Sequence, residues 1–232
     1  MCGREEYSVH FRFLLLLLAL IGSAFAQEHP PQILEIYREF WKPESLAASR
    51  KIEVEASRIC VDLKCPHPYL GLESLTGPKE AWFLNGFASS TEQTQVGEDY
   101  QKNPALLEAL NQILVRKKSL SRADDVNVFA KHLQSLSRGT PWILGKGRFL
   151  VITVTKRELA PKSIEGTAFE ADGTCFIISA ARTRREADER AATRGRETRV
   201  FAVRTAWSLP ARDWVAMDPW FWKGRLTATG AK

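Results

Sequence analysis

The chain has 232 residues, with 33 Lys and Arg, 27 Asp and Glu and a formal net charge of +6. Its hydrophobic content, 44%, is enough for one large domain or two small ones with a buried core. The positive excess is small, and between Arg182 and Arg204 the arginines alternate with acidic residues at helical spacing, as on a solvated helix face. Nucleic-acid binding would require a patch of one sign with aromatic residues among the charges, so we expect no nucleic-acid partner.

Residues 1–26 have the three parts of a secretory signal peptide. Two arginines precede the apolar run FLLLLLALIG, and the small-residue sequence Ala24-Phe25-Ala26 follows it. The run is short for a membrane span, and an uncleaved N-terminal anchor is the alternative. The pattern predicts export with cleavage after Ala26, and therefore a periplasmic or extracellular protein.

The stretch from Ile33 to Phe87 predicts a strand, a helix and two more strands. Residues 33–41, ILEIYREFW, form the first strand, with apolar side chains on both faces. Pro43 ends it, and a helix is expected over residues 47–63. In this helix Glu53 and other charged residues should face water, while one apolar stripe packs on the sheet: Ala48, Ile52, Ala56, Ile59 and Leu63.

Two apolar runs follow this helix, at residues 69–75 and 79–87. The break at Gly77-Pro78 suits a turn between adjacent antiparallel strands. We therefore expect these two runs and residues 33–41 to share one antiparallel sheet.

A further helical region is expected after residue 88. It begins with a capping box, formed either by Ser89 with Glu92 or by Ser90 with Gln93. Asn103-Pro104 interrupts it and begins a second apolar stripe.

This order of elements, opening on a strand that ends in Tyr-Arg-x-Phe-x-Lys-Pro, resembles a known group of proteins. The group is the ferredoxin-like, dimeric α/β-barrel proteins, which include the antibiotic-biosynthesis monooxygenases and the NIPSNAP-type domains. The resemblance covers roughly residues 33–114 and includes the string EIYREFWKP at residues 35–43, although the group often has Gly where this chain has Glu44. It implies an α+β fold in which an antiparallel sheet carries helices on one face. No catalytic residue of the group can be matched, so the catalytic residues stay unknown.

Residues 119–147 have a weaker pattern than the segments on either side. We expect them to connect a first ferredoxin-like unit, residues 27–118, to a second α+β unit, residues 148–222. The run RFLVITVTK, residues 148–156, is the most β-branched of the chain and predicts a buried strand. It is either the fourth strand of the first sheet or the first strand of another.

The rest of the second unit predicts a hairpin, a helix and a strand. Asp172-Gly173 is a strong hairpin signal, and an Arg-rich helix and a strand over residues 199–207 follow it. Residues 223–232 are expected to be a loose tail. The series is compatible with a second copy of the first unit, although we find no residue-level repeat.

Cys60, Cys65 and His67 form the pattern C-x4-C-x-H. A structural zinc site needs a fourth ligand and usually has tighter cysteine pairs. In an exported chain the pattern favours a Cys60–Cys65 disulfide, with free thiols and metal ligation as the alternatives. We expect no metal and no cofactor, and Cys175 should be a small buried apolar residue.

Aromatic residues give the candidate binding site. Tyr37 and Trp41 share one face of the first strand, Trp82 and Asn85 lie on a strand of the same sheet, and His67 lies in the loop that enters it. Trp82 and Asn85 are three positions apart, so they should point to opposite faces unless Gly86 marks a bulge. Core packing is the alternative role for each aromatic residue.

These observations lead to two functional hypotheses. The first is a non-catalytic binding or interaction protein of the cell envelope, which binds an apolar or aromatic small molecule and forms a homodimer through a sheet face. The second, implied by the resemblance, is a cofactor-independent monooxygenase-like or isomerase-like enzyme. A cavity that contains convergent polar groups would favour the second hypothesis.

Overall fold

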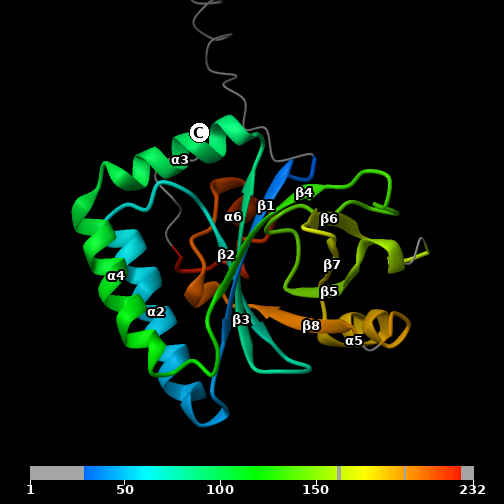
Figure 1. Cartoon of the computed structure of the whole chain (residues 1–232), viewed down its shortest axis with the longest axis horizontal. Coiled ribbons are helices and arrows are strands. Elements are labelled where there is room, and N and C mark those ends of the chain that lie inside the picture. The colour runs from blue at the N-terminus through cyan, green and yellow to red at the C-terminus, as the bar shows by residue number, and fades with distance from the viewer. Residues whose placement is uncertain (1–28, 161–162, 196, 226–232) are drawn as a thin grey trace, which may run out of the picture.

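Figure 1 shows the computed structural model, in which residues 29–160, 163–195 and 197–225 are described. The protein is α+β, and eight antiparallel strands close into a barrel in the order β1-β3-β2-β8-β5-β7-β6-β4. The predicted signal peptide, residues 1–26, lies outside the described residues. None of the described helices has the length and apolar character that a membrane crossing requires.

The first half of the chain supplies four neighbouring strands of the barrel, in the order β4-β1-β3-β2. Its three long helices lie together on one side of the barrel (Figure 1). Its elements are β1 (Ile33–Phe40), α2 (Leu46–Asp62), β2 (Leu70–Ser74), β3 (Glu80–Phe87), α3 (Ser90–Gln101), α4 (Pro104–Lys118) and β4 (Val126–His132). The predicted three-stranded sheet is confirmed, because β3 pairs with β1 on one side and with β2 on the other.

The second half supplies the other four strands, in the order β8-β5-β7-β6. Its elements are β5 (Phe149–Lys156), β6 (Thr167–Ala171), β7 (Thr174–Ala181), α5 (Arg184–Ala192), β8 (Thr198–Val203) and α6 (Arg212–Met217). The predicted hairpin is confirmed: Asp172 and Gly173 join β6 to β7 with φ of 48° and 76°, as a tight two-residue turn requires. Short 3-10 turns occur at Pro43–Ser45, Arg157–Leu159 and Thr205–Trp207.

The two halves repeat one another in strand order and in register. Ile33 of β1 lies opposite Phe87 of β3, and Phe149 of β5 lies opposite Ala181 of β7, in each case the first residue of one strand against the last of the other. On their other edges β1 pairs with β4 and β5 pairs with β8, again in equivalent registers. The pairs β2 with β8 and β4 with β6 join the halves and close the barrel.

A residue-level repeat follows β3 and β7. The Ser89 hydroxyl accepts a hydrogen bond from the backbone N–H of Glu92, and Glu92 in turn accepts from the N–H of Ala88. Thr183 and Glu186 form the same capping box at the start of α5. The pattern Ser/Thr-x-x-Glu after a strand is therefore a repeat that the sequence analysis did not detect. Of the two predicted capping boxes, the structure has the one formed by Ser89 and Glu92.

The segment expected to connect the two units, residues 119–147, contains a strand that its weak sequence pattern did not predict. It contains β4, which is the fourth strand of the first half, so residues 148–156 begin the second half instead. In β4 the inward residues are Val128 and Ala130, whereas Phe129 is 45% exposed on the outer face. This alternation does not separate apolar from polar residues, and the strand is therefore hard to recognise from the sequence.

The predicted loose tail, residues 223–232, needs a correction at its start. Arg225 is half-buried and its guanidinium donates hydrogen bonds to the hydroxyl of Ser57 on α2 and to the carbonyl of Ser208. The predicted strand over residues 199–207 also ends earlier, at Val203, and Trp207 lies in a 3-10 turn. Residues 226–232 lie outside the described part of the chain.

Large apolar side chains from both halves fill the interior of the barrel. Trp82 of the first half is fully buried, and its ring lies 4.9 Å from that of Phe201 and 6.3 Å from that of Phe176, both of the second half. The members of this core with less than 2% exposure include Leu34, Ile36, Leu70, Leu84, Leu150, Phe169 and Trp222. The interior of the barrel is thus a packed core.

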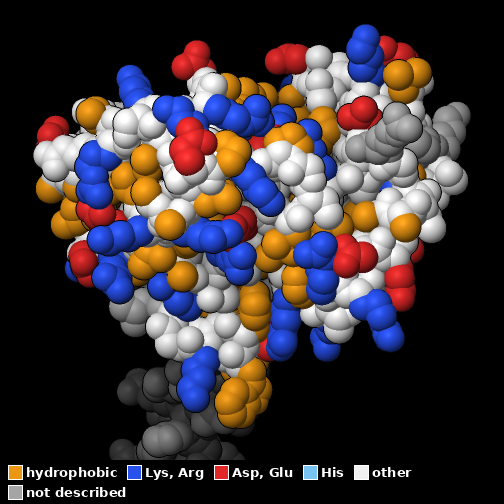
Figure 2. Space-filling model, turned by 90° about the horizontal axis from the view of Figure 1, so that it is seen from below, with side chains coloured by type: hydrophobic (Ala, Val, Ile, Leu, Met, Phe, Trp, Pro, Cys, Tyr) orange, Lys and Arg blue, Asp and Glu red, His pale blue; other side chains and the backbone are white. Residues whose placement is uncertain are grey.

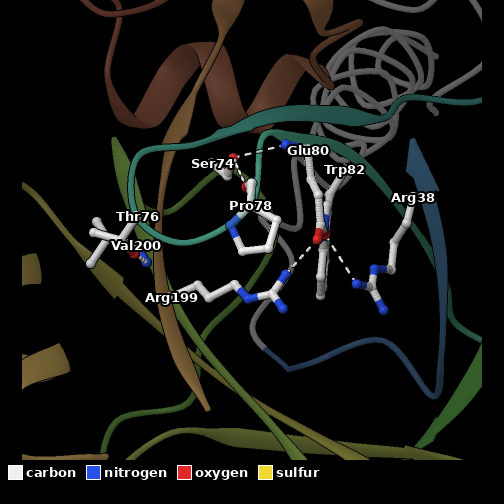
Figure 3. Close-up of polar contacts among 8 residues, drawn as sticks. All are labelled: Arg38, Ser74, Thr76, Pro78, Glu80, Trp82, Arg199 and Val200. Carbon is white, nitrogen blue, oxygen red and sulfur yellow. Dashed lines mark hydrogen bonds and ion pairs between the residues drawn. The ribbon is translucent and has the colours of Figure 1, made fainter. Parts of the chain in front are cut away.

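A buried carboxylate lies in the barrel at the start of β3 (Figure 3). Glu80 is 1% exposed and accepts hydrogen bonds from the indole N–H of Trp82 at 2.7 Å, from Arg38 at 3.0 Å and from Arg199 at 2.6 Å. Two guanidinium groups and an indole therefore satisfy this carboxylate. Because Arg38 and Arg199 come from different halves, the cluster also ties the halves together.

Candidate functional site

A cavity of about 330 Å³ lies between the outer face of β1 and β3 and the three helices of the first half. Alternation along β1 places Leu34 and Ile36 inside the barrel and turns Glu35, Tyr37 and Glu39 outward, toward the cavity. Its other walls come from α2, α3 and α4, and its aromatic lining consists of Tyr37, His67, Tyr69, Phe83, Phe87 and Tyr100. The cavity is thus mostly apolar, with a few polar groups, as is usual for small-molecule sites.

A buried Glu–Lys–Glu cluster lines part of this cavity. Lys117 of α4 donates to Glu39 of β1 at 2.6 Å and to Glu53 of α2 at 2.7 Å. The three residues are only 8%, 2% and 2% exposed. Glu39 also accepts a hydrogen bond from the indole N–H of Trp41 at 3.2 Å. The ammonium thus joins three elements at the cavity wall.

The prediction that Glu53 faces water is wrong. The buried face of α2 consists of Ser49, Ile52, Glu53, Ser57 and Cys60, whereas Ala48 of the predicted stripe is exposed. Ile59 and Leu63 pack instead against Leu106 of α4 and the disulfide. A carboxylate can face inward on this helix because Lys117 supplies an opposite charge there.

Glu53 is the group in the cavity best placed to exchange a proton. Burial raises its pKa well above the ordinary value, and the nearby charge of Glu39 adds to this, while Lys117 acts against it. Burial by itself lowers the pKa of Lys117, but the charges of Glu53 and Glu39 outweigh this and raise it. The cluster therefore holds one ammonium between two carboxyl groups, and burial favours the protonated form of Glu53.

A second carboxylate group lies on the half-exposed side of the cavity. Glu35 accepts a hydrogen bond on one oxygen from the amide of Asn85 at 2.8 Å, and on the other from that of Asn127 at 2.9 Å. Nearby, the hydroxyl of Tyr37 donates to Asp125 at 2.6 Å. Burial raises the pKa of Tyr37, and the hydrogen bond to Asp125 raises it further, so this tyrosine is neutral.

His67 lies at the end of the cavity where the chain leaves α2. Its Nε2 lies 3.0 Å from the carbonyl oxygen of Gly86, and its ring stacks on Phe87 with 4.7 Å between centroids. Burial lowers the pKa of His67, so the ring is neutral at pH 7. The predicted Cys60–Cys65 disulfide is confirmed, with a Cα–Cα distance of 4.7 Å, and it fixes the turn that leads to His67.

Because Cys60 and Cys65 are bonded to each other, neither thiol is a metal ligand. Among the described residues, no group of three or more His, Cys, Asp or Glu side chains is placed to hold a metal ion. Cys175 is buried as a free thiol, as predicted.

The structure brings together three of the five predicted ligand-binding residues. Tyr37, His67 and Asn85 line the cavity. Trp41 is buried beside Glu39 and packs against Trp207 at 5.4 Å, and Trp82 points into the barrel, so neither of them lines it. Trp82 and Asn85 do face opposite sides of β3, as their spacing predicted. A binding role for these residues stays a prediction.

Sequence reasoning missed the charged residues of the site. Glu39 could have been found, because it shares a strand face with Tyr37 and Trp41, where an acid needs a partner. Glu53 and Lys117 carried no such signal. Lys117 stands among Arg116 and Lys118 at the end of α4, where basic residues are favoured by the helix dipole alone.

No known protein family matches the sequence, and no curated protein matches it. The chain is similar to several solved structures, including the following two. One is a candidate monooxygenase from Fusobacterium nucleatum subsp. nucleatum, with a TM-score of 0.43 and 11% identity, over 75% of this chain and 93% of that one. The other is a candidate monooxygenase from Lactobacillus acidophilus, with a TM-score of 0.41 and 7% identity, over 76% of this chain and 94% of that one. Both likenesses are too distant to indicate an activity.

Proposed function

We propose that the protein binds a small apolar or aromatic molecule in the cavity between β1, β3 and the helices α2, α3 and α4. The observation that carries this proposal is the combination of aromatic walls with a buried Glu39–Lys117–Glu53 cluster in one cavity of about 330 Å³. A buried cluster of charges is weak evidence for a stabilising role, because taking the charges out of water can cost more than their pairing gains. An apolar volume with a few fixed polar groups is the arrangement that small-molecule sites share.

Filling the cavity tests this proposal. Leu110 lines the cavity from α4, and Val115 lies on the same helix but is 61% exposed and outside the lining. In isothermal titration calorimetry with 3-methylindole, we expect Leu110→Trp to abolish the binding seen with the unchanged protein and Val115→Trp to preserve it. Circular dichroism would show that both variants keep the fold. Equal binding by Leu110→Trp would place the ligand elsewhere.

The second candidate function is enzymatic, and the raised pKa of Glu53 favours it. A neutral carboxylic acid beside an ammonium can give a proton to one atom of a substrate and take one back from another. Such an isomerase-like reaction leaves the oxidation state of the substrate unchanged. In a screen of enolisable ketones followed by proton–deuterium exchange, Glu53→Gln should stop exchange while ligand binding persists. Exchange that survives this change would remove Glu53 from the chemistry.

We also propose that the halves are two ferredoxin-like units fused in one chain. The strand order β4-β1-β3-β2 and its repeat β8-β5-β7-β6 support this, as does the shared capping box. The described residues between β5 and β6 form no long helix, which is a departure from the first unit.

Export to the periplasm or outside the cell is part of the proposal, and the signal-like residues 1–26 support it. N-terminal sequencing of the native protein is the test, and we expect Gln27 as the first residue. A mature chain that still begins with Met1 would contradict cleavage.

The homodimer through a sheet face also stays a proposal, and β4, with Phe129 exposed on its outer face, is the surface to examine for it.

A further inference from the structure

We propose that the ligand of this cavity carries an ammonium group on its apolar or aromatic body. This inference rests on the proposed function and adds a chemical class to it. Its first support is the charge of the cavity. Among the described lining residues, Glu35, Glu39 and Glu53 are acidic and Lys117 is the only Lys or Arg. The chain as a whole has an excess of basic residues, and Lys and Arg side chains are spread over the face shown in Figure 2.

The cavity's own cation is not available to a ligand. Lys117 is 8% exposed and both Glu39 and Glu53 accept hydrogen bonds from it at less than 2.8 Å. His67 is neutral and its Nε2 faces a backbone carbonyl. An anionic ligand would therefore find no free positive group among the described lining residues, and its desolvation would go uncompensated.

Glu35 is the group that remains to receive a cation. The amides of Asn85 and Asn127 each donate to one of its oxygens, which fixes the carboxylate and still leaves an acceptor position on each oxygen. The negative charge of Glu35 also interacts electrostatically with Tyr100 of α3. Burial raises the pKa of Tyr100 to about 12, and the charge of Glu35 contributes to this rise. The carboxylate thus faces the same space as the aromatic wall.

The aromatic lining suits a cation as well. Positive groups are attracted to the faces of aromatic rings, and an ammonium group among several such rings is a common recognition mode. This cavity already shows the interaction, because Nζ of Lys117 lies 5.3 Å from the centre of the Phe83 ring. An arylalkylamine could place its ring among Tyr69, Phe83 and Phe87 and its ammonium near Glu35.

Three indoles that differ in charge test the inference: tryptamine, 3-methylindole and indole-3-acetate, each titrated calorimetrically at pH 7. We expect the affinity to fall in that order, by about tenfold or more from the first to the last, as a partly exposed ion pair would produce. Glu35→Gln should lower the affinity for tryptamine far more than the affinity for 3-methylindole, and so remove most of this difference. Glu55→Gln is the control, since Glu55 lies outside the cavity and pairs with Arg116.

The outcomes separate the inference from the function on which it rests. If 3-methylindole binds but tryptamine binds no better than indole-3-acetate, the ammonium inference is wrong and the small-molecule site stands. If the order is as expected but Glu35→Gln does not change it, Glu35 is not the recognising group. If none of the three indoles binds, both the inference and the proposed function fail.

Discussion

The two halves of the barrel share their strand order and registers but differ in what covers the outer face. When β1 is matched to β5 and β3 to β7, Glu35 corresponds to Val151, Tyr37 to Thr153 and Asn85 to Ser179. The polar and aromatic lining of the first half thus has small or aliphatic counterparts in the second. The cavity at β1 and β3 is therefore lined by aromatic residues, whereas a cavity of about 280 Å³ at β7 and α5 is lined by Ser179 and by charged side chains such as Glu186 and Arg190.

The number of helices explains the rest of the difference. On the first half, α2, α3 and α4 stand over the sheet and leave room between them. On the second half, α5 alone packs its Ala187 directly against Val151, Ala181 and Val200. A small residue at the contact lets the helix approach the sheet closely, and the cavity that the described residues leave beside α5 has charged side chains in its lining, including Glu186 and Arg190. Its exposed face carries the i,i+4 ion pairs that the sequence predicted.

The largest loss of stability is expected in the core, where side chains of the two halves are in contact. Trp82→Ala removes the ring that contacts Phe176 and Phe201 and also a donor to Glu80. We expect a loss of about 4 kcal/mol in the free energy of unfolding, from the cavity that is left, measured by urea denaturation. Trp220→Ala is the control, because Trp220 is 79% exposed and should change stability by about 0.5 kcal/mol or less. A loss under about 1 kcal/mol would show that the barrel interior is not a shared core.

The next largest loss of stability is expected from the buried Glu39–Lys117–Glu53 cluster, which lies in the first half alone. Lys117→Met leaves Glu39 and Glu53 buried without their cation, and breaking a buried pair in this way costs about 3 kcal/mol. Thermal and urea unfolding should both show it. Lys118→Met, on the exposed side of the same helix, is the matched control. Similar stabilities for the two variants would mean that the cluster does not stabilise the fold.

A smaller effect is expected at the disulfide, which has no counterpart in the second half. Cys60→Ser with Cys65→Ser opens a short loop, so the loss should be about 2 kcal/mol, toward the low end for disulfides. Reduction of the unchanged protein should give the same shift in the urea midpoint. The double variant should not respond to the reductant, and a response there would point to Cys175.

The sequence predicted correctly those strands and turns that depend on a local pattern alone. The alternation of β1, the break at Gly77-Pro78 and the turn at Asp172-Gly173 each follow from local chemistry, and the structure has a strand or turn at each of them. Closure of the barrel could not be predicted, because β4 has Phe129 outside and Ala130 inside and therefore lacks a clear apolar face. The cavity residues Tyr37, His67 and Asn85 were found because a shared strand face, or the loop that enters the sheet, signalled them. The Glu53–Lys117 contact joins two helices over 64 positions, and no local pattern encodes such a pairing.

The last effect is a pH dependence that arises in the first half. The folded protein holds the pKa of Glu53 above its unfolded value, so between these two values the folded state binds more protons than the unfolded state. The stabilisation is complete below the unfolded pKa and is lost as the pH rises through the folded pKa. We expect Glu53→Gln, which mimics the neutral acid, to remove this slope.

The measurement is the difference in free energy of unfolding between the unchanged protein and Glu53→Gln, from urea titrations between pH 4 and pH 9. This difference cancels the contributions of shared groups that do not interact with Glu53, including Asp125, whose pKa burial also raises. The unchanged protein should lose stability relative to the variant as the pH rises. A constant difference would mean that Glu53 has the same pKa in the folded and unfolded states, and the protonated acid on which the enzymatic alternative depends would then be absent at neutral pH.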